Sequence, residues 1–414
     1  MNEIISSKET KYINRRISPK IKEIVDQFPV TVLTGARQVG KSTLLRHEFP
    51  DFTYCTLDDY AVRAQIQLDP QSLWNGTDKI IIDEAQKQPE MFDAIKLAVD
   101  NSGRRKKFIL SGSAKLLLMK HGTESLAGRA LYVELFPMTY GELQELPPKN
   151  FAHLWDPDHF EPDQNVESVD LLPILLRGFM PSLINSSQHG EVLNWLEGYV
   201  RTYLERDLRE LSQVESLIDF RRVMQGLALR TGNILNQADI AKDSQVSHPT
   251  THRYIRLLEV SGIIGRIPAF SVNRTKRPVK SPKIFYVDAA LAIFLSGYFE
   301  KTSLAGCREL GGFFETMVGH HLRSLCEGMT PRASLNYWRT TNGHEVDFVI
   351  EHGRRLLAFE VKMTSRPTAH DIKHLVQFME EYPETVRGVL VHNGDKVCHL
   401  HSKVIAVPWW WLDV

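Results

Sequence analysis

Short apolar runs alternate with amphipathic stretches through the first third of the chain. The apolar runs have the length of buried strands and cover residues 30–33, 52–57, 79–82, 108–110 and 131–135. Helical spacing begins at residue 42 and recurs over residues 91–100. Strands that alternate with helices in this way pair in parallel and are covered by the helices on their faces. The pattern therefore predicts an α/β domain built on a parallel sheet.

The pattern changes after residue 146. Residues 147–170 are rich in Pro, Asp and Asn and have no clean period, which indicates an insertion or linker. Residues 171–211 have helical spacing and predict a small lid. Helical patterns continue over residues 220–270, and residues 284–287 predict a short strand. From residue 311 onward, a predicted helix is followed by several strands and a second helix.

Length and charge set limits on the class of protein. A chain of 414 residues is too long for one ordinary core, so we expect two to four domains. Basic and acidic residues balance at 50 each. A formal net charge of zero excludes a uniformly basic nucleic-acid coat but leaves room for a local basic patch.

Cysteine usage and hydropathy bear on the cellular compartment. Four cysteines lie far apart without a CxxC pair, which disfavours a zinc ribbon and suggests a reducing compartment. Residues 1–20 are polar and charged, unlike a signal peptide, and the sequence has no run of 18 apolar residues. We therefore expect a cytoplasmic protein with no membrane partner.

A phosphate-binding motif lies between the first predicted strand and the first predicted helix. Residues 35–42, GARQVGKS, match the pattern GxxxxGK[ST] at every fixed position. Glycines let backbone N–H groups close around phosphates, and the helix N-terminus adds its dipole. We expect Lys41 to reach the β- and γ-phosphates of ATP and Ser42 to ligate Mg²⁺. The predicted nucleotide contacts are Gly35, Ala36, Arg37, Gln38, Val39, Gly40, Lys41, Ser42 and Thr43.

Two carboxylates follow the third predicted strand in the sequence KIIIDE. We expect Asp83 to hold Mg²⁺, directly or through water, and Glu84 to polarise the attacking water. The fourth strand ends in the sequence SGS, so Ser111 or Ser113 is a further candidate for contact with the γ-phosphate. Alternatively, Ser113 caps a helix over residues 114–119.

Together, the sequences TGARQVGKSTLL, IIIDEAQ, FILSGSAKLL and ESLAGRA resemble one group of AAA+ ATPases. The segments RGFMPSL, YLERDL and KIFYVDAALAIFL also resemble this group, so the resemblance covers nearly the whole chain. It implies an ATPase module joined to a winged helix and to a nuclease-like domain of the PD-(D/E)xK type. It also implies that Arg129 is an arginine finger, often supplied by a neighbouring subunit, and that Arg177 is a second sensor. Surface salt bridges are the alternative for both arginines, and Phe179 and Met180 depart from the family pattern after Arg177.

The middle of the chain resembles a winged helix-turn-helix. Residues 236–242 and 249–260 predict two helices joined by a turn with Ser247 as N-cap, and residues 263–270 and 284–287 predict the wing. Polar residues of the second helix are available for DNA, namely His248, Thr250, Thr251, Arg253 and Arg256. The wing adds Arg274, Lys276, Arg277, Lys280 and Lys283 for phosphate contacts. A winged helix that binds protein is the alternative.

The sequences EVDFVI and AFEVK predict two antiparallel strands that bring Asp347 next to Glu360. Two carboxylates beside Lys362 suit metal-assisted phosphodiester hydrolysis, with Mg²⁺ on the carboxylates and lysine stabilising charge. The spacing resembles the PD-(D/E)xK nucleases, with Val346 in place of proline, and the resemblance adds Glu315 as a metal ligand. A surface salt-bridge cluster or an inactive nuclease fold is the alternative.

The sequence therefore predicts an ATP-hydrolysing, DNA-processing protein that uses ATP and Mg²⁺ and forms a homo-oligomer. Its alternatives are an ATP-switched DNA-binding regulator and an ATPase that remodels a protein partner. The predicted domains are an AAA+ ATPase core (1–146), a linker and helical lid (147–215), a winged helix-turn-helix (216–290) and a C-terminal α/β restriction-endonuclease-like domain (300–414).

Overall fold

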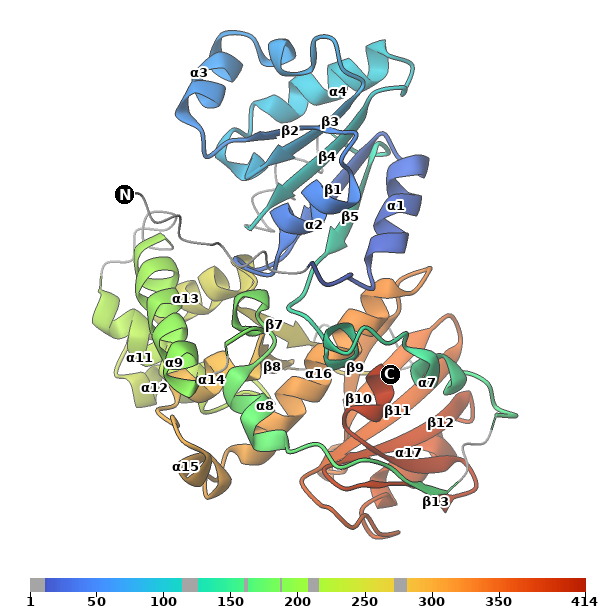
Figure 1. Ribbon diagram of the computed structural model, residues 1–414. Helices are drawn as coiled ribbons and strands as arrows, with labels where there is room; N and C mark the ends of the chain where they lie inside the picture. The colour runs from blue at the N-terminus through green and yellow to red at the C-terminus, as the bar shows by residue number, and fades with distance from the viewer. Residues whose placement is uncertain (1–11, 114–125, 160–162, 187, 208–215, 272–280) are drawn as a thin grey trace, which may run out of the picture.

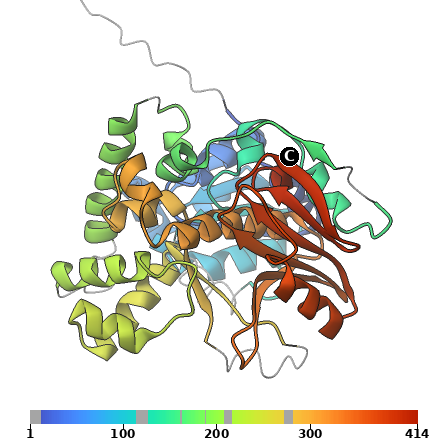
Figure 2. The ribbon, with the colours of Figure 1, turned by 90° about the horizontal axis from the view of Figure 1, so that it is seen from below.

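The computed structural model describes residues 12–113, 126–159, 163–186, 188–207, 216–271 and 281–414. An ATPase-like domain lies at one end of the molecule, and a helical module and a second sheet domain lie side by side beneath it (Figure 1). The view from below shows helix α16 (Leu310–Gly328) between these two lower parts (Figure 2). No helix in the described residues has the length and apolar character needed to cross a membrane.

The first sheet has five parallel strands in the order β2-β3-β4-β1-β5. Their bounds are β1 (Val30–Thr34), β2 (Thr53–Thr56), β3 (Lys79–Asp83), β4 (Lys107–Gly112) and β5 (Ala130–Glu134). Its helices are α1 (Ser18–Gln27), α2 (Lys41–Glu48), α3 (Tyr60–Leu68) and α4 (Met91–Asn101), with short helices at Pro70–Trp74 and Ala85–Lys87. The predicted α/β fold with a parallel central sheet is confirmed.

Alternate residues of β1 explain why both faces of this sheet are covered. Leu33 packs in one hydrophobic cluster with residues of α1 and α2. Val32 points to the opposite face and packs in a second cluster with residues of α4. Successive side chains of a strand point to opposite faces, and every residue of β1 is buried because both faces of the sheet are covered.

The helical module begins after a connecting segment. Its first part contains α8 (Leu171–Arg177), a turn at Pro181–Leu183, α9 (His189–Gly198) and a π-helix at Tyr199–Asp207. Its second part contains α11 (Leu217–Ala228), α12 (Gln237–Ser244), α13 (His248–Val260), the antiparallel strands β7 (Ile264–Ile267) and β8 (Lys283–Tyr286), α14 (Ala289–Leu295) and α15 (Lys301–Ala305). Ser247 caps α13 by accepting a hydrogen bond from the Thr250 backbone, as the sequence predicts.

The C-terminal domain packs α16 and α17 (Lys373–Glu381) against a seven-stranded sheet in the order β6-β13-β14-β12-β11-β10-β9. The strands are β6 (Gln164–Asn165), β9 (Ser334–Arg339), β10 (Glu345–His352), β11 (Arg355–Lys362), β12 (Thr385–His392), β13 (Lys396–His401) and β14 (Val404–Pro408). Strands β10 and β11 pair antiparallel with Phe348 opposite Phe359. A short helix at Trp411–Asp413 follows β14.

The segment interpreted as an insertion or linker packs against the C-terminal domain. Strand β6 pairs with β13, and α7 (Lys149–His153) contacts the short helix at Trp411–Asp413. These residues therefore belong to the C-terminal sheet domain rather than to a free linker. Their polar composition misled the interpretation because β6 is a two-residue edge strand with both side chains exposed.

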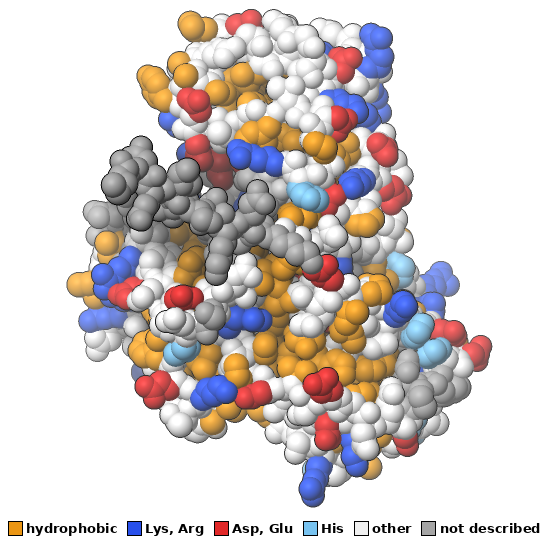
Figure 3. Space-filling model, in the orientation of Figure 1, with side chains coloured by type: hydrophobic (Ala, Val, Ile, Leu, Met, Phe, Trp, Pro, Cys, Tyr) orange, Lys and Arg blue, Asp and Glu red, His pale blue; other side chains and the backbone are white. Residues whose placement is uncertain are grey.

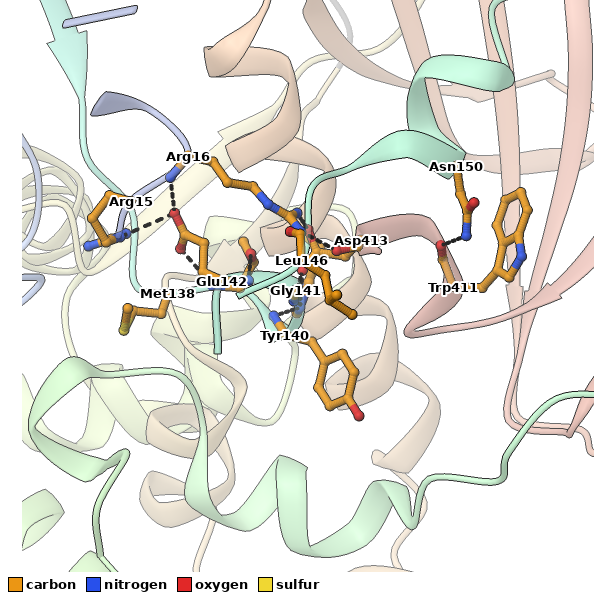
Figure 4. Close-up of polar contacts among 12 residues, drawn as sticks. Arg15, Arg16, Met138, Tyr140, Gly141, Glu142, Leu146, Asn150, Trp411 and Asp413 are labelled. Atoms are coloured by element: carbon orange, nitrogen blue, oxygen red, sulfur yellow. Dashed lines mark hydrogen bonds and ion pairs between the residues drawn. The ribbon is translucent and has the colours of Figure 1, made fainter. Parts of the chain in front are cut away.

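Three parts of the chain meet at a buried polar junction beside α6 (Tyr140–Leu143) (Figure 4). Glu142 is 3% exposed and accepts hydrogen bonds from the Arg15 side chain at 3.2 Å and from the Arg16 backbone at 2.8 Å. The Arg16 guanidinium pairs with Asp413, which is fully buried and also accepts a hydrogen bond from the Gly141 backbone. The junction ties the start of α1 to the end of the C-terminal domain.

Candidate nucleotide site and carboxylate cluster

The P-loop connects the carboxyl end of β1 to the start of α2. Gly35 has φ +150°, and an added Cβ would lie 2.2 Å from the Leu135 carbonyl oxygen, so only glycine fits there. Gly40, with φ +92°, precedes the first helical residue, Lys41. The N-terminal N–H groups of α2 consequently face the loop, as phosphate binding requires.

Lys41 lies folded back onto this loop. Its ammonium group donates hydrogen bonds to the carbonyl oxygens of Gly35 at 3.1 Å and Ala36 at 2.8 Å, and the residue is 6% exposed. Burial lowers the pKa of Lys41 to about 8, although Glu84 and Asp83 oppose this shift. The two carbonyl contacts hold the ammonium inside the loop that the sequence assigns to phosphates.

Asp83, at the end of β3, accepts several hydrogen bonds from side chains on neighbouring strands. Ser42 donates to its Oδ2 at 2.5 Å, Tyr54 donates to the same oxygen at 2.6 Å, and Ser111 donates to Oδ1. Burial raises the pKa of Asp83, but the hydrogen bonds from Ser111, Ser42 and Tyr54 outweigh it and hold the pKa below its usual value. Asp83 is therefore held as a carboxylate. Tyr54 was missed from the sequence, where it is an ordinary strand residue.

The arrangement around Ser42 and Asp83 fits Mg²⁺. A hydroxyl and a carboxylate in hydrogen-bond contact offer the hard oxygen ligands that Mg²⁺ takes alongside water and phosphate. A cavity of about 630 Å³ opens beside them and is also lined by Tyr12, Thr43 and His47. Its volume lies within the range of small-ligand sites.

Glu84 follows Asp83 in a left-handed conformation, with φ +55°. Its carboxylate is partly buried and accepts a hydrogen bond from Gln86. A non-glycine residue in this conformation is uncommon and aims its side chain away from the strand direction. Glu84 thus lies next to the predicted Mg²⁺ ligand, and its role as the group that polarises water stays a prediction.

The helical module contacts the P-loop directly. The Tyr199 hydroxyl donates to the Arg37 carbonyl at 3.2 Å, and Ser182 donates to the Gln38 side chain at 3.3 Å. Gly262, with φ +73°, lies so close that an added Cβ would be 3.2 Å from the backbone nitrogen of Ala36. The residues assigned to phosphate binding are therefore in contact with the turn that follows α13.

Three further candidates lie apart from this centre. Arg129 precedes β5 and forms a two-pronged ion pair with Asp100, with both N–O distances at 2.7 Å. Parallel pairing puts its backbone beside the start of β1, about 16 Å along the strand from the P-loop. Arg177 lies near Asp288, with its pKa lowered by burial. Ser113 follows β4, but it is Ser111 that contacts Asp83, and the predicted helix over residues 114–119 lies outside the described residues.

The residues predicted for nuclease chemistry gather on β10, β11 and α16. Asp347 precedes Phe348 and Glu360 follows Phe359, so the β10–β11 register brings them to neighbouring positions. Asp347 accepts a hydrogen bond from the Val361 backbone at 2.9 Å. Glu360 pairs with Lys362 at 2.6 Å. Burial and the charge of Asp347 raise the pKa of Glu360 to about 8.

Lys283 enters this cluster from β8, in disagreement with its predicted place on an exposed wing. Its side chain is 3% exposed, and its ammonium pairs with Glu345 at 2.5 Å, Glu315 at 2.8 Å and Asp347 at 3.2 Å. Burial alone would lower the pKa of Lys283, but the three carboxylates outweigh it and raise the pKa well above its usual value. Burial and Asp347 raise the pKa of Glu315. The interpretation failed because an absence of acidic residues in the local sequence says nothing of acids brought in from β10 and α16.

In this arrangement, the carboxylates of the cluster do not fit a divalent cation, because the Lys283 ammonium group already lies between them. Among the described residues, no group of three or more His, Cys, Asp or Glu is placed to hold a metal ion. Metal binding by Glu315, Asp347 and Glu360 is therefore a prediction from the sequence that the position of Lys283 disfavours.

Models of known protein families match three consecutive parts of the chain. A model described as an AAA domain matches residues 27–144, and two models described as domains of unknown function, DUF8612 and DUF4143, match residues 169–302 and 310–412. The uncharacterized protein Rv2008c of Mycobacterium tuberculosis is 30% identical over 396 residues, which cover 95% of this chain and 83% of that protein. The uncharacterized protein MJ1544 of Methanocaldococcus jannaschii is 25% identical over 83% of this chain and 76% of its own length.

Among solved structures, the Walker-type ATPase paby2304 of Pyrococcus abyssi covers 69% of this chain and 96% of its own, with 18% identity and a TM-score of 0.46. The P-loop, the parallel sheet and the AAA-domain match define the N-terminal domain as a P-loop ATPase domain of the AAA class. The chain belongs to the family of Rv2008c. In this chain, the ATPase domain precedes the two domains of unknown function.

Proposed function

We propose that this protein hydrolyses ATP and uses the change in its nucleotide site to alter how it engages DNA. The observation that supports this most is the contact between Gly262 and Ala36. Gly262 is the second residue after α13, the helix assigned to DNA, and Ala36 is part of the phosphate-binding loop. If bound phosphates change the shape of this loop, the turn after α13 must either move with the loop or resist the change.

In the proposed reaction, Lys41 leaves its carbonyl partners and turns to the β- and γ-phosphates. Ser42 and Asp83 would hold Mg²⁺, which would neutralise phosphate charge. Glu84 accepts a proton from the attacking water. Arg129 lies too far from its own P-loop, so we assign it to the site of a neighbouring copy in a homo-oligomer.

The proposed DNA-binding element is a winged helix-turn-helix formed by α12, α13 and the β7–β8 hairpin. His248, Arg253 and Arg256 are exposed on α13 and suit phosphate and base contacts. Thr251, which the sequence analysis included, is fully buried and is removed from this set. The predicted wing residues Arg274, Lys276, Arg277 and Lys280 lie outside the described residues.

Charge on the visible face agrees with a local rather than a general DNA surface. Acidic and basic side chains are interspersed over the face in Figure 3, without a broad field of one sign. Electrostatic binding to DNA needs a concentrated basic surface. We therefore base the assignment of DNA on the exposed basic residues of α13.

The test is an ATPase assay with purified protein, with and without duplex DNA. We expect wild-type turnover to change when DNA is added, and Arg256→Ala to lose this response while keeping its DNA-free rate. Lys96→Ala, which removes an exposed charge from α4, outside the proposed DNA-binding element, is the matched control. If DNA leaves ATP turnover unchanged and the protein does not bind DNA at low salt, the DNA part of the proposal is wrong, and a protein-remodelling ATPase becomes the better interpretation.

A further inference from the structure

The carboxylate cluster of the C-terminal domain already contains a cation supplied by the chain itself. Lys283 lies on β8, whereas Glu345 and Asp347 lie on β10 and Glu315 lies on α16. One ammonium group thus pairs with carboxylates from two elements of another domain, at 2.5 to 3.2 Å. A buried charge of this kind is stable only where opposite charges surround it.

The backbone holds Lys283 firmly in this position. Backbone hydrogen bonds tie Pro282 to Leu235 at 2.8 Å and Ile284 to Gly232 and Asn233 at 2.8 and 3.0 Å. The neighbouring Phe285 is buried and packs against Phe348 of β10, with ring centroids 5.5 Å apart. Withdrawing Lys283 together with its strand would break these contacts, so the ammonium is built into the fold.

A second feature is a carboxylate oxygen that neither Lys283 nor another group satisfies. Glu360 is 4% exposed, and its Oε2 atom has no hydrogen-bond partner among the described residues. Its other oxygen pairs with Lys362. Leaving a carboxylate oxygen buried and unpaired is costly, and such atoms mark a place where a ligand is missing or has been replaced.

We propose that Lys283 is the resident cation of this cluster and takes the place of a divalent metal ion. The nuclease-like domain of the intact protein then binds no Mg²⁺ or Mn²⁺ at Asp347, and Lys283 instead joins the β7–β8 hairpin to the C-terminal sheet. This inference is independent of ATP hydrolysis and DNA binding. It favours the inactive nuclease fold among the alternatives left open by the sequence.

The test measures Mn²⁺ binding to the full-length protein by electron paramagnetic resonance, with Mn²⁺ alone as the probe. Each protein is compared with its own Asp347→Asn partner, so that any cation at Ser42 and Asp83 cancels. We expect wild type and Asp347→Asn to bind the same number of Mn²⁺ ions. We expect Lys283→Met to bind one Mn²⁺ more than Lys283→Met/Asp347→Asn. Lys301→Met, which removes an exposed lysine paired with Asp170, should behave as wild type.

An Asp347-dependent Mn²⁺ site in the wild-type protein would overturn the proposal, as would a folded Lys283→Met protein without such a site. If Lys283→Met does not fold in metal-free buffer, refolding it in Mn²⁺ decides: recovery supports the proposal and continued failure overturns it. Lys283→Met/Glu345→Gln leaves less unbalanced negative charge in the cluster. It is compared with its own Asp347→Asn partner in the same way and should also bind one Mn²⁺ more than that partner. ATP turnover measured on the same samples reports separately on the proposed function.

Discussion

The contacts of Lys41 predict that nucleotide affinity will fall as pH rises above neutrality. Burial lowers the pKa of this lysine to about 8, whereas bound phosphates will favour its charged form. Between about pH 7 and about pH 9.5, the protonated fraction of a group with this pKa drops about 30-fold. If only charged Lys41 binds phosphate, the ATP dissociation constant should rise by the same factor, or about 2 kcal/mol.

The assay is a titration of the protein with a fluorescent ATP analogue and Mg²⁺ at several pH values in this range. Burial raises the pKa values of Tyr54 and Cys55 to about 12, so these neighbours stay protonated and uncharged throughout this range. Lys41→Arg, whose guanidinium stays protonated, should bind more weakly but lose the pH dependence. A wild-type affinity that stays constant from pH 7 to pH 9.5 would refute the reasoning.

The same pKa has a consequence for stability. A lysine whose pKa is lowered from 10.5 to about 8 on folding binds fewer protons in the folded state than in the unfolded chain between these values. Lys41 therefore makes the free energy of unfolding rise with pH in this window. Chemical denaturation of the nucleotide-free protein at pH 8 and pH 10, compared with Lys41→Met, isolates its contribution.

Three further predictions concern the nucleotide site and the exposed face of α13. Glu84→Gln should retain ATP binding but lose about 10²- to 10⁴-fold in ATP turnover. The control Glu90→Gln, which changes an exposed residue nearby, should leave turnover unchanged. Normal turnover in Glu84→Gln would contradict the role assigned to Glu84. Ser111→Ala removes a hydrogen bond to Asp83, so the affinity of the variant for Mg²⁺–ATP should fall about tenfold. The pH below which binding is lost should also rise, and calorimetry at several pH values would show both effects. Arg253→Ala/Arg256→Ala should weaken DNA binding and lower the salt slope by about one per lost phosphate contact, and an unchanged slope would assign α13 to protein contact.

The ATPase half of the structure could be read largely from the sequence. Strand β1 is buried along its whole length, and the P-loop motif fixes where β1 ends and α2 begins. Such local signals place Lys41, Ser42 and Asp83 at one edge of a parallel sheet. They do not identify Tyr54 as a hydrogen-bond donor to Asp83, because that contact depends on which strands are neighbours.

The lower half was harder to predict because its important contacts join distant segments. Lys283 and Asp347 are paired although they lie in different predicted domains. Strand β6 was hidden in a polar stretch, since its pairing with β13 relies on backbone hydrogen bonds rather than on an apolar face. When contacts with another domain bury a side chain, the hydrophobic periodicity of its own segment does not predict that burial.

The junction between Arg16 and Asp413 also has a consequence for how the protein is made. These two side chains are paired across 397 residues of sequence, and Asp413 is fully buried. Domains form largely in order as a chain leaves the ribosome, so the first sheet can assemble long before residue 413 is added. Until then, Arg15 and Arg16 can engage Glu142, but the Asp413 part of the junction is missing. The part of the ATPase domain that is synthesised first is thus among the last to acquire its full set of contacts.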